Sequence, residues 1–91
     1  MKNWQELRKE LDFTEEDENI IRIEKELIQT MVSIREEQGL SQTELSEKCK
    51  VKQPTLARME KNVHSPRVDS LLRILTRLGY TLQIVPLGKN K

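Results

Sequence analysis

Apolar residues recur at helical spacing along most of the chain, and the longest such stretch lies between Thr14 and Gln38. Thr14 is a good capping residue, acids follow it where the helix dipole favours them, and Gly39 is a typical stop. Glu24 and Arg35 interrupt an apolar face that is wider than one packing seam requires. The apolar positions are Ile20, Ile21, Ile23, Leu27, Ile28, Met31, Val32 and Ile34. We expect the C-terminal half of this helix to pack on a domain, and the early isoleucines to have another partner.

Two short helices are predicted next, with almost no chain between them. Ser41 and Glu44 form a capping box that opens a helix of about eight residues. The second helix begins near Gln53, where Pro54 is tolerated because first-turn N–H groups have no partner within a helix. Asn62 suits the left-handed residue that ends it. The inward-facing positions are Leu45, Cys49, Leu56 and Met59, with Val51 between the helices.

Two further helices complete an all-α prediction for the chain up to Gly79. One opens at Ser65 and Pro66, as cap and first residue, and ends at Gly79. Its apolar stripe is Val68, Leu71, Leu72, Leu75 and Leu78. Near the N-terminus, Asn3 and Glu6 form a further capping box, which opens a short helix that would be marginal alone. The apolar residues of that N-terminal helix are Trp4, Leu7 and Leu11.

The period of the apolar pattern changes after Gly79. Tyr80, Leu82 and Ile84 alternate with Thr81, Gln83 and Val85, and Pro86 stops the run, which predicts one C-terminal β-strand. The sequence offers no second convincing strand, and a lone strand leaves its backbone groups unpaired. We therefore predict a homodimer in which the Tyr80–Val85 strands of two copies pair antiparallel, with Tyr80, Leu82 and Ile84 as the dimerisation residues.

Composition limits the class of protein. A chain of 91 residues suggests one domain with a small core. Only 35% of residues are hydrophobic and 3% aromatic, so the core must use aliphatic side chains, which favours packed helices. One cysteine excludes an internal disulfide and fits a reducing cytosol. No apolar run approaches the roughly 20 residues of a membrane span, and no signal peptide is recognisable, so we expect a cytoplasmic protein without membrane partners.

Charge is unevenly placed although the net charge is only +1. Residues 1–18 hold seven acids and three bases, a net −4, which leaves +5 for the remainder. Residues 48–67 hold six bases and one acid. The asymmetry suggests a polyanion partner on one side and a different partner at the N-terminus, although charge alone is equally consistent with an ordinary solvated surface.

The two short helices have the pattern of a helix-turn-helix, in which the first helix braces and the second enters the major groove of DNA. Gln can contact adenine through two bonds, and Arg can contact guanine likewise, so Gln53 and Arg58 are candidate base readers. Pro54 and Ala57 share their outer face. The residues suited to phosphates, which position the protein without reading sequence, are Lys52, Thr55, Lys61 and Arg67.

The stretch "LSQTELSEKCKVKQPTLARMEKN", followed by "SPRVDSLLRIL", resembles the helix-turn-helix of Cro/C1-type (XRE family) repressors over about residues 27–78. The resemblance implies that Gln42 caps the first short helix toward a phosphate and that Glu60 is structural. It also implies base-facing positions for Gln53, Pro54, Ala57 and Arg58.

Four positions depart from the usual pattern of that family. Ser46 stands at the tight helix crossing where Ala is common, and Cys49 replaces Leu, which makes it a core residue and not a reactive thiol. Lys50 replaces the usual Gly. This replacement would lower the stability by up to about 1 kcal/mol if the position needs a positive φ. Pro54 replaces a small polar residue, so it can touch a thymine methyl but cannot donate a hydrogen bond.

The whole layout resembles HigA-type antitoxins, which implies that the protein represses its own operon from a palindromic operator and neutralises a RelE-like (HigB-type) toxin that cleaves mRNA. Its parts would be residues 1–18 as an acidic toxin-binding extension, 19–79 as the DNA-binding domain and 80–91 as the dimerisation tail. The candidate toxin-binding residues are Trp4, Leu7, Leu11, Phe13, Ile20, Ile21 and Ile23. Local packing of the first four onto the long helix is an alternative, and a HipB-type antitoxin of a kinase-fold toxin and a plain repressor remain open.

An enzyme is the main competing class. The sequence shows no cluster with metal-ligand spacing and no phosphate-cradling glycine loop, so we expect neither catalysis nor a metal or other cofactor. His64, the single histidine, is expected to be a surface loop residue near DNA phosphate. A protein-interaction module with a degenerate helix-turn-helix is disfavoured by the polar and basic residues on the outer face of the second short helix.

Overall fold

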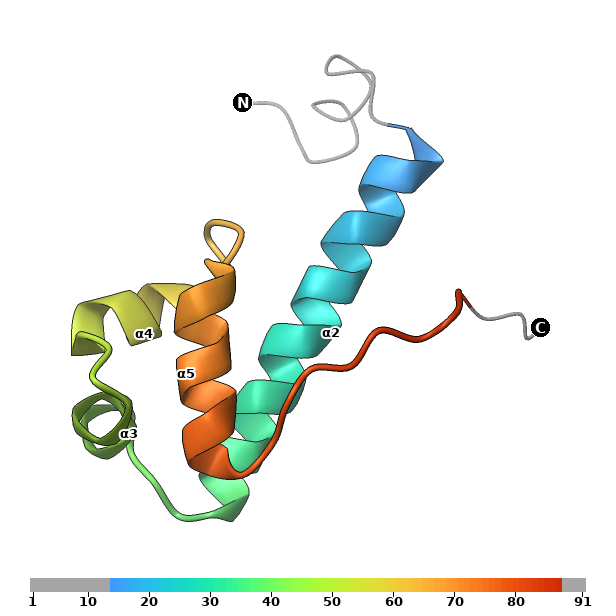
Figure 1. Cartoon of the computed structure of the whole chain (residues 1–91). Coiled ribbons are helices and arrows are strands. Elements are labelled where there is room, and N and C mark those ends of the chain that lie inside the picture. Colours follow the sequence, from blue (N-terminus) through green and yellow to red (C-terminus); the bar gives the residue numbers. More distant parts are fainter. Residues whose placement is uncertain (1–13, 88–91) are drawn as a thin grey trace, which may run out of the picture.

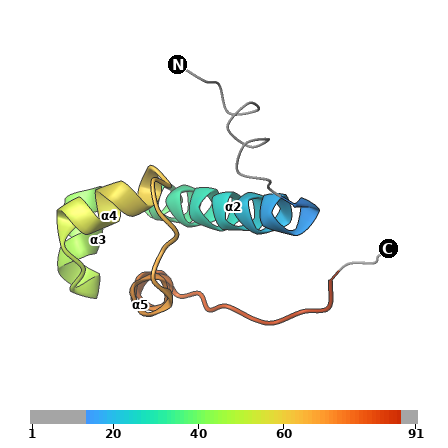
Figure 2. The same ribbon diagram turned by 90° about the horizontal axis from the view of Figure 1, so that it is seen from above.

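The computed structural model describes residues 14–87, which form four helices (Figure 1). In chain order these are α2 (Glu15–Glu37), α3 (Gln42–Cys49), α4 (Gln53–Glu60) and α5 (Val68–Leu78). The short pair α3 and α4 lies at one end, with α5 beside it, and α2 reaches away from that group (Figure 2). The expected N-terminal helix, with Trp4, Leu7, Leu11 and Phe13, lies outside the described residues.

The beginning of α2 follows from its local sequence. The Thr14 hydroxyl accepts a hydrogen bond from the Asp17 N–H at 3.1 Å, and the Asp17 carboxylate accepts one from the Thr14 N–H at 3.1 Å. This reciprocal capping satisfies two N–H groups that the helix cannot pair. The helix ends at Gln38, and Gly39 follows in the left-handed region at φ 71°. Both predicted ends are therefore confirmed.

The apolar face of α2 has two parts with different surroundings. Toward the C-terminus Ile28 and Met31 are each 1% exposed. Toward the N-terminus Ile20 is 48% and Ile23 45% exposed, and Ile21 is exposed as well. This division agrees with the sequence analysis, and it leaves three isoleucines in water on the half of α2 that projects from the domain (Figure 1).

The core draws on all four helices. Its fully buried large side chains are Ile28, Met31, Leu45, Leu56 and Ile74. Burying an aliphatic side chain of this size contributes about 1.5–3 kcal/mol. Cys49 is 6% exposed among these residues, so its predicted place in the core is confirmed.

Helix α3 begins with the second predicted capping box, in which the Ser41 hydroxyl accepts from the Glu44 N–H and the Glu44 carboxylate accepts from the Ser41 N–H. The helix ends at Lys50, which adopts the left-handed conformation at φ 58°. The position thus has the backbone for which Gly is usual. Ser46 is buried at the crossing and donates its hydroxyl to the Thr43 carbonyl at 2.8 Å, which satisfies the polar group there.

Helix α5 corrects two details of the sequence analysis. It begins at Val68, with Arg67 as its cap residue, and not at Ser65 and Pro66. The Ser65 hydroxyl donates instead to the Glu24 carboxylate of α2 at 3.1 Å, so it does not cap the helix. The left-handed end at Gly79 is confirmed at φ 91°.

The buried stripe of α5 also differs from the expected one. Leu71, Leu75 and Leu78 are buried as predicted, but the stripe also includes Ile74, which is 0% exposed and was not predicted to belong to it. Val68, at 66% exposed, lies at the start of the helix, and Leu72, at 37%, lies on the flank of the buried row. On a helical wheel Ile74 lies next to Leu78, on the side of the buried row away from Leu72, which explains its burial.

The segment after α5 carries no β-strand within residues 80–87, which corrects the sequence prediction. Apart from the Tyr80 N–H, which closes the end of α5 on the Leu75 carbonyl at 2.8 Å, the segment is irregular and leaves the helix as an extended stretch (Figure 2). A strand forms through hydrogen bonds to a neighbour, and no other described segment of the chain offers one. Tyr80, Leu82 and Ile84 are all exposed.

Candidate nucleic-acid interface

The inner and outer sides of α4 are sharply different. Leu56 and Met59 are buried against the rest of the domain, as predicted. Gln53 and Ala57 are half-buried at the edge of the outer face. The exposed residues of the helix and its two ends are Lys52, Pro54, Thr55, Arg58 and Lys61. The residues of α4 assigned to DNA from the sequence are therefore exposed except for Gln53 and Ala57, which are half-buried.

The connection between α3 and α4 gives this outer face its direction. Lys50 turns the chain in the left-handed conformation, Val51 is buried at 8% exposure, and Lys52 is the cap residue of α4. Only these three residues separate the helices. Because Val51 anchors the turn in the core, α4 lies across α3 as in a helix-turn-helix.

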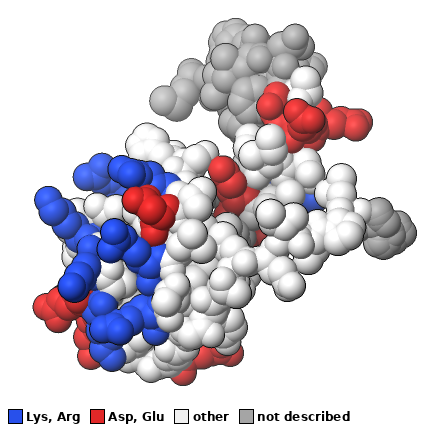
Figure 3. All heavy atoms as spheres, viewed as in Figure 1, with Lys and Arg blue, Asp and Glu red and all other residues white. Residues whose placement is uncertain are grey.

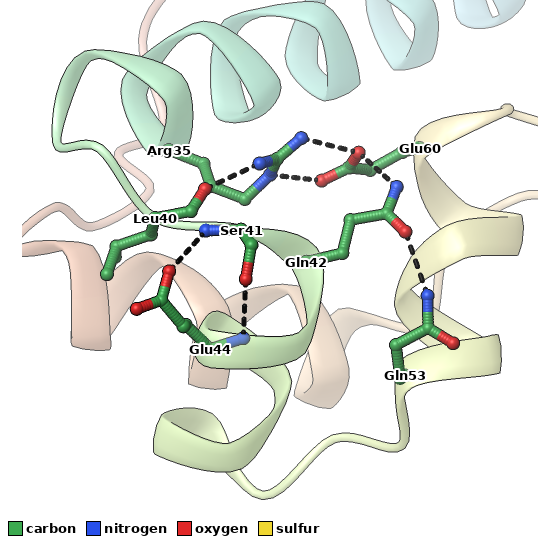
Figure 4. A network of polar contacts seen from close by, with 7 residues as sticks. All are labelled: Arg35, Leu40, Ser41, Gln42, Glu44, Gln53 and Glu60. Atoms are coloured by element: carbon green, nitrogen blue, oxygen red, sulfur yellow. Dashed lines mark hydrogen bonds and ion pairs between the residues drawn. The ribbon is translucent and has the colours of Figure 1, made fainter.

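A buried ion pair fixes the C-terminal end of α4 to α2 (Figure 4). The Arg35 guanidinium donates from Nε to Glu60 Oε2 at 2.7 Å and from Nη2 to Oε1 at 3.0 Å. Its Nη1 donates to the Leu40 carbonyl at 2.6 Å. The two side chains are only 10% and 8% exposed. The arginine that interrupts the apolar face of α2 thus has a partner 25 residues away, and the structural role expected for Glu60 is clear.

The same carboxylate continues the network toward Gln53 at the start of α4 (Figure 4). Gln42 Nε2 donates to Glu60 Oε1 at 2.8 Å. Gln53 Nε2 in turn donates to Gln42 Oε1 at 2.9 Å. In the free protein Gln42 is therefore a bridge between Glu60 and Gln53, a role that the expected phosphate cap did not include. One N–H of Gln42 remains for a phosphate oxygen.

Gln53 is oriented by this bridge before any ligand arrives. One of its amide N–H groups is used by Gln42, and its carbonyl oxygen and second N–H remain for a ligand. Those two groups are the acceptor and donor that a bidentate contact with adenine requires. A side chain held in this way loses less conformational freedom on binding than a free glutamine.

A hollow of about 250 Å³ joins the exposed side of α4 to the loop before α5. It brings Thr55 and Arg58 of α4 together with His64 and Arg67 of the loop. His64 is exposed, as expected for a surface loop residue. Arg67 also pairs with Asp69, Nε to Oδ1 at 3.2 Å, but both side chains are well exposed, so solvent weakens this pair.

Figure 3 shows most Lys and Arg side chains gathered at one end of the molecule, with several acids among and below them and a further acidic group at the opposite end. Lys and Arg gather over α3, α4 and α5, whereas the acids Glu15 to Glu18 lie at the far end of α2. The exposed Ile20, Ile21 and Ile23, which the sequence analysis assigned to a toxin, lie next to those acids. The outer face of α4 and the exposed isoleucines of α2 are therefore on different parts of the molecule.

Other kinds of site find no support in the described part of the chain. Residues 14–87 contain no group of three or more His, Cys, Asp or Glu side chains placed to hold a metal ion. None of the helices within those residues is long and apolar enough to cross a bilayer.

Comparison with known families agrees with this geometry. The sequence profile described as helix-turn-helix matches residues 31–85, more than half of the chain. The chain belongs to the helix-turn-helix family. A relative of this helix-turn-helix chain, described as an uncharacterized HTH-type transcriptional regulator of Haemophilus influenzae, is 39% identical over 85 residues, which are 93% of this chain and 86% of that protein.

A solved structure resembles the helix-turn-helix chain over nearly its whole length. It is described as a toxin–antitoxin module from Streptococcus pneumoniae, and the matched chain is 38% identical with a TM-score of 0.68. The match covers 96% of each chain. The likeness therefore extends beyond the two short helices to the long α2 and the segment that follows α5.

Proposed function

We propose that this chain is an antitoxin that binds operator DNA through α4 and represses the operon that encodes it. The observation that carries the proposal is the outer face of α4, where Gln53 is oriented by Gln42 beside the exposed Arg58. Membership of the helix-turn-helix family supports DNA as the ligand. The similarity to a chain of a solved toxin–antitoxin module supports the antitoxin role.

The residues of the DNA-facing surface divide into two roles. Gln53 and Arg58 read bases in the major groove, with Pro54 and Ala57 packed against the base edges. The remaining residues hold phosphates and set the position of the protein on the duplex. These are Gln42, through its remaining N–H, and Lys52, Thr55, Lys61 and Arg67.

The proposed toxin-binding surface (the toxin grip) is the N-terminal part of the chain. Residues 1–18 carry a net charge of −4, and Ile20, Ile21 and Ile23 place three exposed apolar side chains directly after them. A RelE-like, RNA-binding toxin is basic, so charge would speed the encounter while the apolar contacts would slow dissociation. This partner makes the chain a HigA-type antitoxin, with residues 1–18, 19–79 and 80–91 serving toxin binding, DNA binding and dimerisation.

We further propose that the chain acts as a homodimer. The exposed Tyr80, Leu82 and Ile84 form an apolar surface after α5 that a second copy would cover. A two-fold symmetric dimer would place two α4 helices in successive major grooves, about 34–36 Å apart, and so select a palindrome. A single helix of eight residues reads too few bases to define an operator alone.

A plain transcriptional repressor is the second candidate, because the Haemophilus influenzae relative is described as a transcriptional regulator. The two candidates share the DNA-facing surface and differ only in the need for a toxin. The isoleucines of α2 therefore discriminate between them.

Selection of binding sites from a random duplex library tests the DNA-binding half of the proposal. We expect the wild-type chain to enrich a palindrome and the Arg58→Ala variant to lose that preference. Lys25→Ala removes an exposed positive charge from α2 and serves as the matched control. A wild-type chain that enriches no sequence would overturn the proposal.

Co-expression with the product of the adjacent gene tests the antitoxin half. We expect a growth-inhibiting, basic neighbour that the chain neutralises and binds in a stable complex. A chain that enriches an operator, but neither binds nor neutralises its neighbour, would be a plain repressor.

A further inference from the structure

A second basic surface lies away from the outer face of α4. The C-terminal end of α3 and the exposed side of α5 enclose a shallow hollow, lined by Lys48 and Lys50 from one side and by Arg73 and Arg77 from the other. All four are exposed residues. None of them belongs to the set assigned to DNA through α4.

The positive charge of this hollow is only weakly compensated within the described residues, where Lys48 also acts through its charge on the Glu44 carboxylate of its own helix. None of the four cations forms an ion pair within those residues. The single acid of the lining, Asp69, already accepts from Arg67 at 3.2 Å and from the Ser70 N–H at 2.8 Å. Four positive charges therefore converge on one hollow while its one negative charge is engaged elsewhere.

Several of these residues are unfavourable for the fold itself. Lys50 occupies the left-handed region at φ 58°, where a glycine would be less strained. Arg73 and Arg77 are four residues apart on one helix face, where like charges repel each other. Neither feature helps the domain to fold, but both bring positive charge to the same hollow.

The hollow is continuous with the basic surface that faces DNA. Figure 3 shows basic side chains spread over one face of the molecule, from α4 across α3 to α5. Leu72, at 37% exposed, is the only large apolar side chain exposed in the lining, which is a small anchor for a polypeptide. Four cationic head groups around a single exposed large apolar side chain suit a phosphate backbone.

We propose that the α3–α5 hollow binds the phosphate backbone of the duplex just outside the bases that α4 reads. Lys48, Lys50, Arg73 and Arg77 would then lengthen the footprint of each protomer without adding base contacts. This inference rests on the proposed DNA-binding function and extends it to a second phosphate track on flanking DNA.

Duplex length and salt dependence test the inference. The probes are two duplexes with the palindrome enriched by the wild-type chain, one ending at that palindrome and one extended by about one helical turn on each side. The test variant is Arg73→Gln/Arg77→Gln. The control is Arg22→Gln/Lys25→Gln, which removes the same charge from exposed positions of α2.

We expect the test variant to bind the short duplex like wild type and the extended duplex more weakly. The slope of log K against log salt on the extended duplex should become shallower by about 0.9 for each phosphate that the variant no longer neutralises. Lys50→Gly, which suits the left-handed backbone, should show this change for a single phosphate while folding at least as well. The control should change binding to neither duplex.

Unchanged slopes for both test variants on the extended duplex would overturn the inference. So would unchanged DNA binding combined with loss of binding to poly-L-glutamate, because the hollow would then be a surface for acidic protein. If the wild-type chain enriches a palindrome but the test variants give either of these contrary results, the inference fails and the proposed function stands. If it enriches none, the proposed function fails and this inference fails with it.

Discussion

The two ends of α2 have different surroundings. Around its C-terminal half, Arg35 donates hydrogen bonds to Glu60 and to the Leu40 carbonyl, and in the described part of the chain no buried side-chain nitrogen or oxygen lacks a partner. Around its N-terminal half, Ile20 and Ile23 are nearly half exposed. One end of the helix is thus built into a completed domain, and the other presents apolar area to water.

The two ends therefore differ in what binding would require: side chains near the C-terminal end are already oriented by the protein, whereas the isoleucines at the N-terminal end are exposed to solvent. Beside the C-terminal half, Gln53 of α4 is held in place by Gln42, so the proposed contact with DNA would need little reorganisation. Adjacent exposed isoleucines are unusual on a finished surface and typical of a partner site. Changes at the first end should therefore affect folding and DNA, and changes at the second should affect a protein partner.

The largest expected effect is the loss of toxin neutralisation when the isoleucine-bearing end is altered. Ile20→Ser/Ile23→Ser, or deletion of residues 1–18, should abolish neutralisation in co-expression, because the apolar anchors that slow dissociation are removed. Operator binding by the free variant should be nearly unchanged. Leu72→Ser alters an apolar side chain exposed elsewhere and serves as the control. Neutralisation at equal molar ratio by the double variant would place the grip on the domain or after α5.

The next effect is on the stability of the completed end. Glu60→Ala leaves the Arg35 guanidinium buried without its carboxylate, and should lower the free energy of unfolding by about 3–5 kcal/mol in urea titration. Ile20→Ser at the exposed end should change it by no more than about 0.5 kcal/mol.

An apolar replacement of both partners sharpens this prediction. Arg35→Met/Glu60→Leu removes both charges together and should lower the free energy of unfolding much less than Glu60→Ala does. If Glu60→Ala lowered the free energy of unfolding by less than about 1 kcal/mol, water would have to reach the Arg35 guanidinium. This end of the domain would then be less closed than its geometry indicates.

Smaller effects should separate base readers from phosphate anchors. Gln53→Ala and Arg58→Ala should each weaken operator binding by about 1–3 kcal/mol and relax base preference, because each removes a contact to a base edge. Lys61→Ala should weaken operator and random DNA alike and make the salt slope shallower by about 0.9. Equal behaviour of all three variants on both DNAs, measured by fluorescence anisotropy, would contradict the division of roles.

The smallest effect concerns pH. The Ser41 N–H, which donates to the Glu44 carboxylate, and then the Ser41 hydroxyl lower the pKa of Glu44 from its ordinary 4.5. Since the folded pKa is depressed, the stabilisation is present above the unfolded value and is lost as pH falls through the folded value. Glu44→Gln should therefore flatten the acid side of a plot of melting temperature against pH. Parallel curves for the two proteins would show that the cap contributes nothing to pH dependence.

Much of the fold is predictable because its signals are local. The capping boxes at Thr14 and Ser41 and the left-handed ends at Asn62 and Gly79 involve residues close in sequence, and the structure confirms them. The division of the α2 apolar face follows from its excess width.

The differences arise where a residue finds a distant partner or lacks one. Ser65 resembles a helix cap but bonds to Glu24, 41 positions away. The run from Tyr80 has strand periodicity, but within the described chain no neighbouring strand is present to pair with it.

In the candidate site, too, contacts between residues distant in sequence could not be predicted. The outward residues of α4 can be read from its period, and the structure places them as expected. The bridge through Gln42 cannot, because it joins residues 11 and 18 positions apart on different elements. Arg35 on the apolar face of α2, together with the structural role that the family resemblance implies for Glu60, is the sequence signal for this buried ion pair.

The Arg35–Glu60 pair also constrains how this sequence can evolve. Replacing the pair by an apolar one takes two substitutions at positions 25 apart, and the chain that carries only the first is expected to lose about 3–5 of the roughly 5–15 kcal/mol typical of a folded domain. Such an intermediate would be cleared before the second substitution arrived. The pair should thus be inherited or lost as one character in descendants of this chain, whereas the exposed isoleucines of α2 can change one at a time.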